Sequence, residues 1–156
     1  MRGDVIDDRP SNAPSTVVLE LEGLRCLLVD DDADTQDLML FVLEERGAVV
    51  SVAGSADEAM VRLAEASHDV LISDIGLPHT DGMSLIRAVR DLAPERGGSI
   101  PAVAVTGYAR VQDKNDALRA GFQAHLAKPI EPAELVRTIA TIARTPVPSP
   151  VKSRDP

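Results

Sequence analysis

Four places in the sequence hold polar residues directly after short apolar runs, and the residue types suit phosphate and metal chemistry. These residues are Asp30, Asp31 and Asp32 after one run, Asp74 after another, Thr106 after a third and Lys128 after the last. Carboxylates that lie close together repel one another by about 4 kcal/mol per pair at ~4 Å and an effective dielectric of ~20. If folding brings these aspartates together, they therefore need a bound cation or raised pKa values.

Mg²⁺ is the cation that we expect at such a cluster, since it binds a few carboxylates together with water and phosphate oxygens. Zinc is disfavoured because His and Cys residues do not occur at ligand spacing. A calcium loop of the EF-hand type is excluded as well. Counted from Asp30, its sixth position is Thr35 rather than Gly, and its twelfth is Phe41 rather than Glu.

Five apolar runs alternate with five segments of helical spacing, which predicts a strand before each helix. The strands are expected at residues 25–30, 48–53, 70–74, 102–106 and 124–127. The helices are expected at 33–46, from Ser55 to Ala66, from the turn Asp81-Gly82 to about Leu92, up to Gly121, and at 132–143. Gly47 and Gly121 suit the left-handed residue that ends a helix. Ser55 and Glu58 match a capping box, in which each side chain accepts a hydrogen bond from a free backbone N–H.

Strands that are apolar on both faces and alternate strictly with helices indicate a parallel sheet covered on both sides. We therefore predict an α/β domain of three layers. In such folds, ligands bind beyond the carboxyl ends of the strands, which meet at one edge of the sheet. The polar residues after the strands should converge at that edge, although about 100 residues separate Asp30 from Lys128.

The chain of 156 residues is long enough for one hydrophobic core, and we place this domain at residues 21–144. Residues 1–20 and 145–156 are expected to be disordered tails. The first segment lacks a helical period, and the second carries four Pro residues. Val17 to Leu21 could form a short extended piece that leads into the domain.

The formal net charge of -9 argues against direct binding to nucleic acid, which needs clustered Lys and Arg. A signal peptide and an apolar stretch of membrane-spanning length are both missing from the sequence, so a cytoplasmic protein without membrane contact is expected. The single Cys26 lies in an apolar run and has no partner for an internal disulfide. It should be a buried core thiol.

In all, the chain resembles the receiver domains of two-component response regulators over residues 24–143. The matching segments are Leu27 to Asp32, Leu71 to Pro78, Asp81-Gly82, Val105 to Gly107 and Ala127 to Pro129. The resemblance implies a flavodoxin-like three-layer sandwich, with five helices and a five-stranded parallel sheet of order 2-1-3-4-5. It also implies a phosphorylated signalling domain rather than an enzyme with turnover.

Carried over by position, the resemblance makes Asp74 the phosphoacceptor and Asp30 and Asp31 the acidic pair. Mg²⁺ would be bound by Asp30, Asp31, Asp74 and the backbone carbonyl of Gly76. Thr106 would be the switch hydroxyl, and Lys128 the ammonium that pairs with Asp74 or its phosphate. The bond Lys128-Pro129 is expected to be cis. The phosphate would come from a histidine kinase or a histidine phosphotransfer protein, and the fourth helix, fifth strand and fifth helix would bind the downstream protein.

Two features depart from the family pattern. Many receivers place an aromatic switch residue three positions before the lysine, where this chain has His125. The histidine could act as the switch, or it could be an ordinary half-buried strand residue. At the two positions where the family carries side chains that tune hydrolysis of the acyl phosphate, this chain has Gly76 and Tyr108. We hypothesise that neither side chain assists hydrolysis.

Several residues have simpler structural interpretations. Asp32 is expected to cap the first helix, and Asp81-Gly82 to form a turn without a ligand role. His68 and His79 are expected to be solvated loop residues. The basic group on the fourth helix, which comprises Arg110, Lys114 and Arg119, is read as a solvated face rather than a docking surface.

Two other functions compete with the receiver interpretation. A phosphatase resembling the haloacid dehalogenases would use Asp30 as nucleophile and Asp32 as acid. That family needs a late acidic pair on a further strand, whereas only Glu131 and Glu134 occur after Lys128, on a predicted helix. The other alternative is a binding module with the same fold and an idle site.

Overall fold

The computed structural model describes residues 19–77, 81–107 and 111–143, and of residues 111–113 only the backbone. The strands are β1 (Arg25–Val29), β2 (Val49–Ala53), β3 (Val70–Asp74), β4 (Ala102–Thr106) and β5 (Ala124–Ala127). The helices are α1 (Ala33–Glu45), α2 (Ala56–Glu65), α3 (Gly82–Arg90), α4 (Val111–Ala120) and α5 (Pro132–Ala143), with a short 3-10 helix η1 (Pro94–Arg96) before β4. The alternation of strand and helix is as predicted.

The five strands form one parallel sheet of order β2-β1-β3-β4-β5, which confirms the order implied by the family resemblance. The register keeps the carboxyl ends of neighbouring strands nearly level. Val29 pairs with Ser73, Asp74 with Val105, and Thr106 with Ala127. This level edge is what allows residues after different strands to meet.

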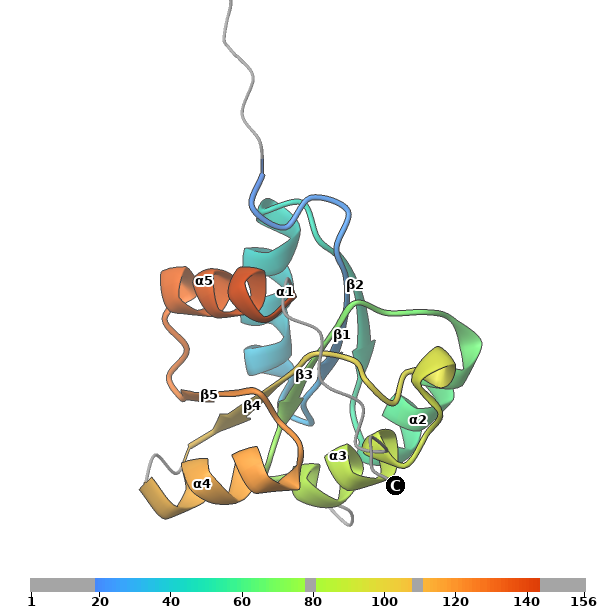
Figure 1. The fold of residues 1–156 in the computed structure, drawn as a ribbon. Helices are drawn as coiled ribbons and strands as arrows, with labels where there is room; N and C mark the ends of the chain where they lie inside the picture. The colour runs from blue at the N-terminus through green and yellow to red at the C-terminus, as the bar shows by residue number, and fades with distance from the viewer. Residues whose placement is uncertain (1–18, 78–80, 108–110, 144–156) are drawn as a thin grey trace, which may run out of the picture.

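Helices cover both faces of the sheet, with α1 and α5 on one side and α2, α3 and α4 on the other (Figure 1). Alternate residues of the central strands enter the two cores. Leu28 and Ile72 pack toward α1 and α5, whereas Leu27 and Leu71 pack toward the other three helices. All four side chains have no exposed surface, so both faces of the sheet contribute apolar burial to stability.

The glycines predicted to end α1 and α4 do follow those helices, whereas the capping box predicted for the start of α2 differs in one bond. Gly47 and Gly121 have φ values of 92° and 132°, in the left-handed region that glycine adopts readily. Ser55 accepts a hydrogen bond from the backbone N–H of Glu58, as in a capping box. The Glu58 carboxylate, however, accepts from the N–H of Gly54 rather than from that of Ser55. The Glu58 side chain therefore binds the backbone of Gly54, the residue that precedes the helix cap Ser55.

Three details differ from the sequence predictions. Residues 20–23 form a turn rather than an extended piece, and Leu21 is buried in the core beside α1 and α5. The helix η1 was not predicted, since three residues are too few for a helical period. Several elements are also one or two residues shorter than expected; β1, for example, ends at Val29, which leaves Asp30 in the following loop.

Cys26 is fully buried, as predicted, and burial raises the pKa of its thiol to about 12.

Nearly all residues of the two predicted tails lie outside the described residues. Within the described residues, none of the helices combines the length and the apolar character needed to cross a lipid bilayer.

Candidate functional site

The polar residues that follow the strands come together at the carboxyl edge of the sheet. Asp30, Asp31 and Asp74 each place a carboxylate oxygen within 4.8 Å of the others. The Asp30 side chain is completely buried and that of Asp74 nearly so, whereas Asp31 is exposed. The cluster therefore has two acids anchored in the protein and one that faces solvent. Thr106, which ends β4, is also buried at this edge.

Lys128 supplies the positive charge of the cluster. Its Nζ lies 3.2 Å from Asp30 Oδ2 and 3.4 Å from Asp74 Oδ2. The backbone N–H of Lys128 donates a hydrogen bond to the Thr106 carbonyl, which fixes the lysine directly after β5. The peptide bond Lys128-Pro129 is cis, as expected from the resemblance. One ammonium is thus shared between Asp30, which directly follows β1, and Asp74, which ends β3.

The pKa shifts at the site reflect a balance between burial and charge. Burial raises the pKa of Asp30, and the charge of Asp74 adds to this effect; the Asp32 N–H and Lys128 oppose it. For Lys128, burial alone would lower the pKa, but Asp30 and Asp74 outweigh it and raise the value. The charged form of Lys128 is therefore favoured. For Asp30, the neighbouring N–H and ammonium do not fully offset the cost of burying its charge.

The charge balance fits a hard cation. Three carboxylates and one ammonium leave a formal charge of -2, and oxygen atoms from the loop after β1 and from the end of β3 lie close enough to share an ion. Oxygen ligands of this kind are preferred by Mg²⁺. Gly76 follows the cluster and donates its N–H to Asp74 Oδ1 at 3.1 Å. The geometry is thus compatible with Mg²⁺, and the ligand role of the Gly76 carbonyl stays a prediction.

The burial of Asp30 predicts a gain in stability when its charge is removed. An acid whose pKa is raised by folding destabilises the folded state increasingly as the pH rises from its unfolded pKa through its folded pKa. Asp30→Asn should therefore unfold at higher denaturant concentration than wild type at neutral pH. The difference should disappear at pH values below the usual range for aspartate. Denaturant titrations across this pH range test the prediction, and a variant less stable at every pH would contradict it.

Asp32 does not belong to the cluster but caps α1, as predicted. Its carboxylate accepts hydrogen bonds from the backbone N–H and the hydroxyl of Thr35. These bonds lower the pKa of Asp32. Asp32 is therefore tied to the helix start, while its two neighbours Asp30 and Asp31 face the site.

The turn Asp81-Gly82 has a role in the site that the sequence interpretation missed. Asp81 caps α3 by accepting from the Ser84 N–H, and the Gly82 N–H donates to the Ile75 carbonyl. A Cβ atom added to Gly82 would lie 2.4 Å from the Asp74 carbonyl oxygen and 2.8 Å from Ile75 Cα. The start of α3 therefore packs directly on the backbone of Asp74. Sequence alone could only indicate a turn here, because the contact is made across the loop.

We expect Gly82→Ala to destabilise the protein by about 2 kcal/mol, because the added methyl group collides with backbone that cannot move aside cheaply. Denaturant unfolding measures the change. Gly107→Ala is the matched control, since an added Cβ there meets nothing within 4 Å. Equal stability of the Gly82 variant and the control would show that α3 can shift without cost.

His125 lies on β5, half buried, and pairs in register with Ala104. Both interpretations of this residue remain compatible with its position.

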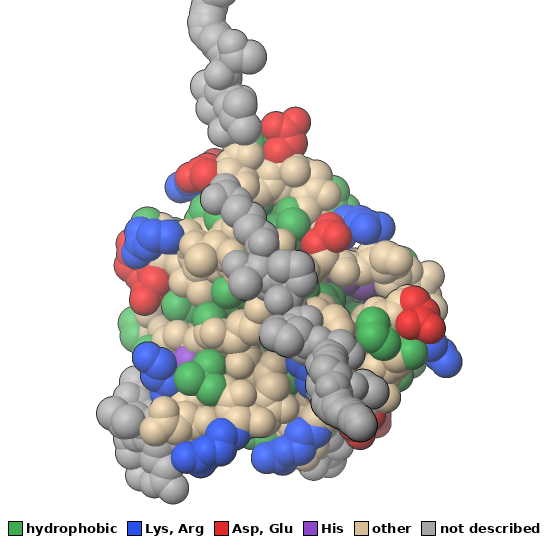
Figure 2. All heavy atoms as spheres, viewed as in Figure 1, with side chains coloured by type: hydrophobic (Ala, Val, Ile, Leu, Met, Phe, Trp, Pro, Cys, Tyr) green, Lys and Arg blue, Asp and Glu red, His purple; other side chains and the backbone are tan. Residues whose placement is uncertain are grey.

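Tyr108, Arg110 and His79 lie outside the described residues. The other members of the basic group on α4 are exposed, and Arg119 pairs with Asp116 one turn away. Figure 2 shows Lys and Arg side chains at the surface on the side where α4 lies, and the solvated face stays a prediction.

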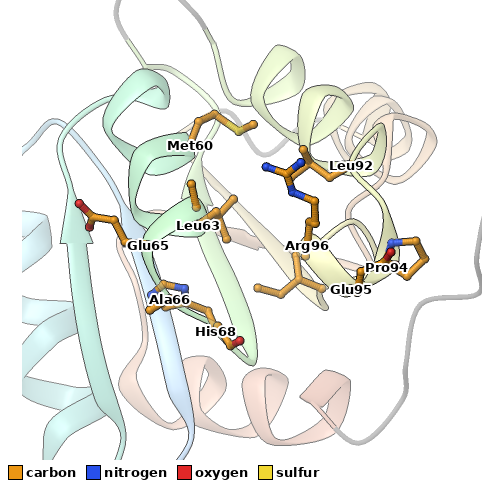
Figure 3. Close-up of a pocket in the computed structure, with 13 residues that line it drawn as sticks. Met60, Leu63, Glu65, Ala66, His68, Leu92, Pro94, Glu95 and Arg96 are labelled. Atoms are coloured by element: carbon orange, nitrogen blue, oxygen red, sulfur yellow. The ribbon is translucent and has the colours of Figure 1, made fainter.

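A hollow of about 500 Å³ lies at the opposite edge of the sheet, between the end of α2, the loop before β3 and η1 (Figure 3). Its apolar lining includes Met60, Leu63, Leu92 and Ile100. His68 lines it too. It lies in a loop, as predicted, but it is half buried rather than fully solvated, with Nε2 3.4 Å from Ser51 Oγ. Burial lowers the pKa of this histidine. The hollow is remote from the carboxylates and takes no part in their chemistry.

A doubly wound parallel sheet with a polar cluster at its carboxyl edge is typical of open α/β domains that bind ligands beyond the ends of their strands. Residues 26–140 match the family model of the response regulator receiver domain, and the chain belongs to this family.

The relatives include proteins of similar and of much greater length. An uncharacterized 14.6 kDa protein of Leptolyngbya boryana is 47% identical over 113 residues, which are 72% of this chain and 85% of that protein. The match covers only 52% of the two-component response regulator PhoP of Pseudomonas aeruginosa and 8% of hybrid signal transduction histidine kinase I of Dictyostelium discoideum. The chain thus spans about half or less of these two relatives.

Solved structures agree with the fold. A putative response regulator from Chloroflexus aurantiacus has a TM-score of 0.75 and 32% identity, over 79% of this chain and 99% of that one. The receiver domain of sensor histidine kinase PA1611 from Pseudomonas aeruginosa has a TM-score of 0.72 and 30% identity, with the same coverage of both chains. That crystal structure holds a magnesium ion coordinated in the active site cleft.

Proposed function

We propose that this receiver domain accepts a phosphoryl group on Asp74 in a two-component or phosphorelay pathway, and that the phosphate alters a protein-interaction surface. The observation that supports this most strongly is the position of Lys128 Nζ, shared between Asp30 and Asp74 where three carboxylates converge. Phosphoryl transfer requires mainly positioning and charge stabilisation, which this arrangement offers.

In the proposed reaction, a carboxylate oxygen of Asp74 attacks the phosphorus of a phosphohistidine or of acetyl phosphate. The new O–P bond forms as the bond from phosphorus to the imidazole nitrogen or acetate oxygen breaks, and the leaving group keeps the electron pair. Lys128 stabilises negative charge on the transferred phosphoryl group, and Thr106 offers a hydroxyl to it. Asp30 and Asp31, with Asp74 and the Gly76 carbonyl, would hold Mg²⁺, and the ion would supply positive charge to the phosphoryl oxygens.

The partners follow from the same chemistry. A histidine kinase or a histidine phosphotransfer protein donates the phosphate, as the receiver family and the sensor histidine kinase relatives suggest. Output passes to a protein that binds the face formed by α4, β5 and α5. Thr106 ends β4, the strand before α4, and His125 lies on β5 itself. A movement of either residue on phosphorylation would therefore reach an element of this face. A phosphate that binds two states of the domain differently shifts their populations.

The phosphatase alternative loses support in the structure. Glu131 accepts a hydrogen bond from the Glu134 N–H and so caps the start of α5. The carboxylates that would form the late acidic pair thus begin a helix instead of following a further strand. Asp74, which the phosphatase interpretation leaves without a role, belongs to the cluster together with Asp30 and Asp31.

The deciding experiment is incubation of the purified protein with acetyl phosphate, with Mg²⁺ or with excess EDTA, followed by separation on a phosphate-affinity gel. A shifted band that requires Mg²⁺ is expected. Turnover of a generic phosphomonoester should be absent, because a receiver does not release product catalytically. If acetyl phosphate and a panel of histidine kinases all leave the protein unmodified, the proposal fails and the binding-module interpretation replaces it.

A further inference from the structure

The peptide group that joins Asp30 to Asp31 links the buried and the exposed acid of the cluster. The Gln36 side chain, one turn into α1, donates a hydrogen bond from Nε2 to the Asp30 carbonyl oxygen of this peptide. The other side of the turn is tied as well. The Asp32 N–H donates to Asp30 Oδ1 at 2.9 Å, and the Gln36 N–H donates to the Asp32 carbonyl at 3.0 Å. Gln36 thus contacts the turn through its backbone and its side chain.

The orientation of this peptide determines where Asp31 points. A peptide plane turns about ψ of the residue before it and φ of the residue after it, because the peptide bond itself is rigid. A bond to the carbonyl of Asp30 therefore restricts ψ of Asp30 and φ of Asp31 together. The Asp31 side chain is exposed, so it lacks the tight packing that holds Asp30 in place. Its direction depends on the backbone from which it projects.

Helix α1 does not need this bond in order to fold. Met39, Val42 and Leu43 bury its inner face, and Asp32 caps its first turn. A side-chain hydrogen bond to a backbone carbonyl outside the helix adds little to that packing. Its effect should instead be concentrated in the acidic turn that precedes the helix.

We propose that Gln36 is a positioning residue that preorganises Asp31 for the cation. This inference rests on the proposed function, since it concerns the Mg²⁺ site of the same cluster. Gln36 itself touches neither the ion nor the phosphate. It acts by holding the Asp30-Asp31 peptide, so that the exposed carboxylate is already directed toward Asp74 before the ion binds. Preorganisation of this kind strengthens binding because less freedom is lost on association.

The test compares Gln36→Met, which keeps the length of the side chain but removes the donor, with Gln36→Asn, which keeps the amide but is one methylene shorter. Both should weaken Mg²⁺ binding by about 10-fold, measured by calorimetry, as is typical when a group that orients a metal ligand is lost. At saturating Mg²⁺, labelling by acetyl phosphate should reach the wild-type rate. In metal-free protein, the Asp32 amide should exchange faster with solvent.

Gln123→Met is the matched control. Gln123 also bonds the backbone through its side chain, by accepting from the Ala102 N–H at 3.0 Å, but it lies at the amino edge of the sheet. This variant should lose stability without any change in Mg²⁺ affinity. A merely structural role for Gln36 would give the same pattern as the control, and that result would overturn the inference. If the wild type itself fails to bind Mg²⁺, the proposed function fails, and amide exchange in the metal-free protein still decides whether Gln36 holds the turn.

Discussion

Asp74→Asn is expected to abolish the modification of this protein by acetyl phosphate. An amide oxygen is a far weaker nucleophile than a carboxylate, so the acyl phosphate cannot form at this position. The substitution should leave the fold intact. Asparagine keeps an oxygen that can accept the Gly76 N–H now bonded to Asp74 Oδ1, and Lys128 retains its ion pair with Asp30.

The phosphate-affinity gel with Mg²⁺ measures this effect directly. The exposed Asp57 on α2 offers a control, because Asp57→Asn changes the net charge by the same amount away from the site. The control should be modified like the wild type. Undiminished modification of Asp74→Asn would show that another residue is the acceptor, and mapping of the modified peptide would then identify it.

Lys128→Met is expected to produce the second large effect. The lysine ammonium lies within 3.4 Å of two carboxylates, and the Lys128 side chain is only 24% exposed. Loss of a single preorganised charge that stabilises a transition state commonly slows a reaction by about 10²-fold or more. We therefore expect phosphorylation by acetyl phosphate to slow by about 10²-fold, with the product still located on Asp74.

The same variant should also change the pH dependence of stability. Without Lys128, the pKa of the buried Asp30 rises further, because its main positive neighbour is gone. The native state then binds a proton that the unfolded state releases, so stability falls as the pH rises toward neutrality. Thermal unfolding should show a larger deficit at neutral than at acidic pH. Lys114→Met, on the exposed face of α4, is the control and should change neither property. A wild-type rate for Lys128→Met would remove the lysine from the proposed reaction.

Much of the fold follows from local patterns. The bounds of β3, β4 and β5 agree with the structure because each strand begins after a polar residue or a proline and ends at or just before a polar residue. The ends of α1 and α4 were predictable since Gly47 and Gly121 adopt a conformation that other residues avoid. Local patterns were less informative for the segment before β1. Leu21 belongs to a turn, and its side chain is buried against α1 and α5, which lie far from it in the sequence.

The candidate site was predictable to a similar extent. The carboxyl ends of parallel strands lie at one edge of the sheet, and this rule alone predicted a common location for Asp30, Asp31, Asp74, Thr106 and Lys128. The family resemblance suggested their roles. Only the tertiary structure decided how these groups share their charges. It also decided which neighbours hold them, namely Gly82 behind Asp74 and Gln36 beside Asp30.

The physical reason for this division is the range of the interactions involved. Strand and helix preferences, caps and apolar periodicity depend on residues within a few positions of one another, so the sequence by itself determined the order of elements and the edge at which the chemistry lies. The partial burial of His68, the sharing of Lys128 between two carboxylates and the close approach of Gly82 to Asp74 depend on contacts between separate elements. Such contacts exist only once the sheet and its helices have packed.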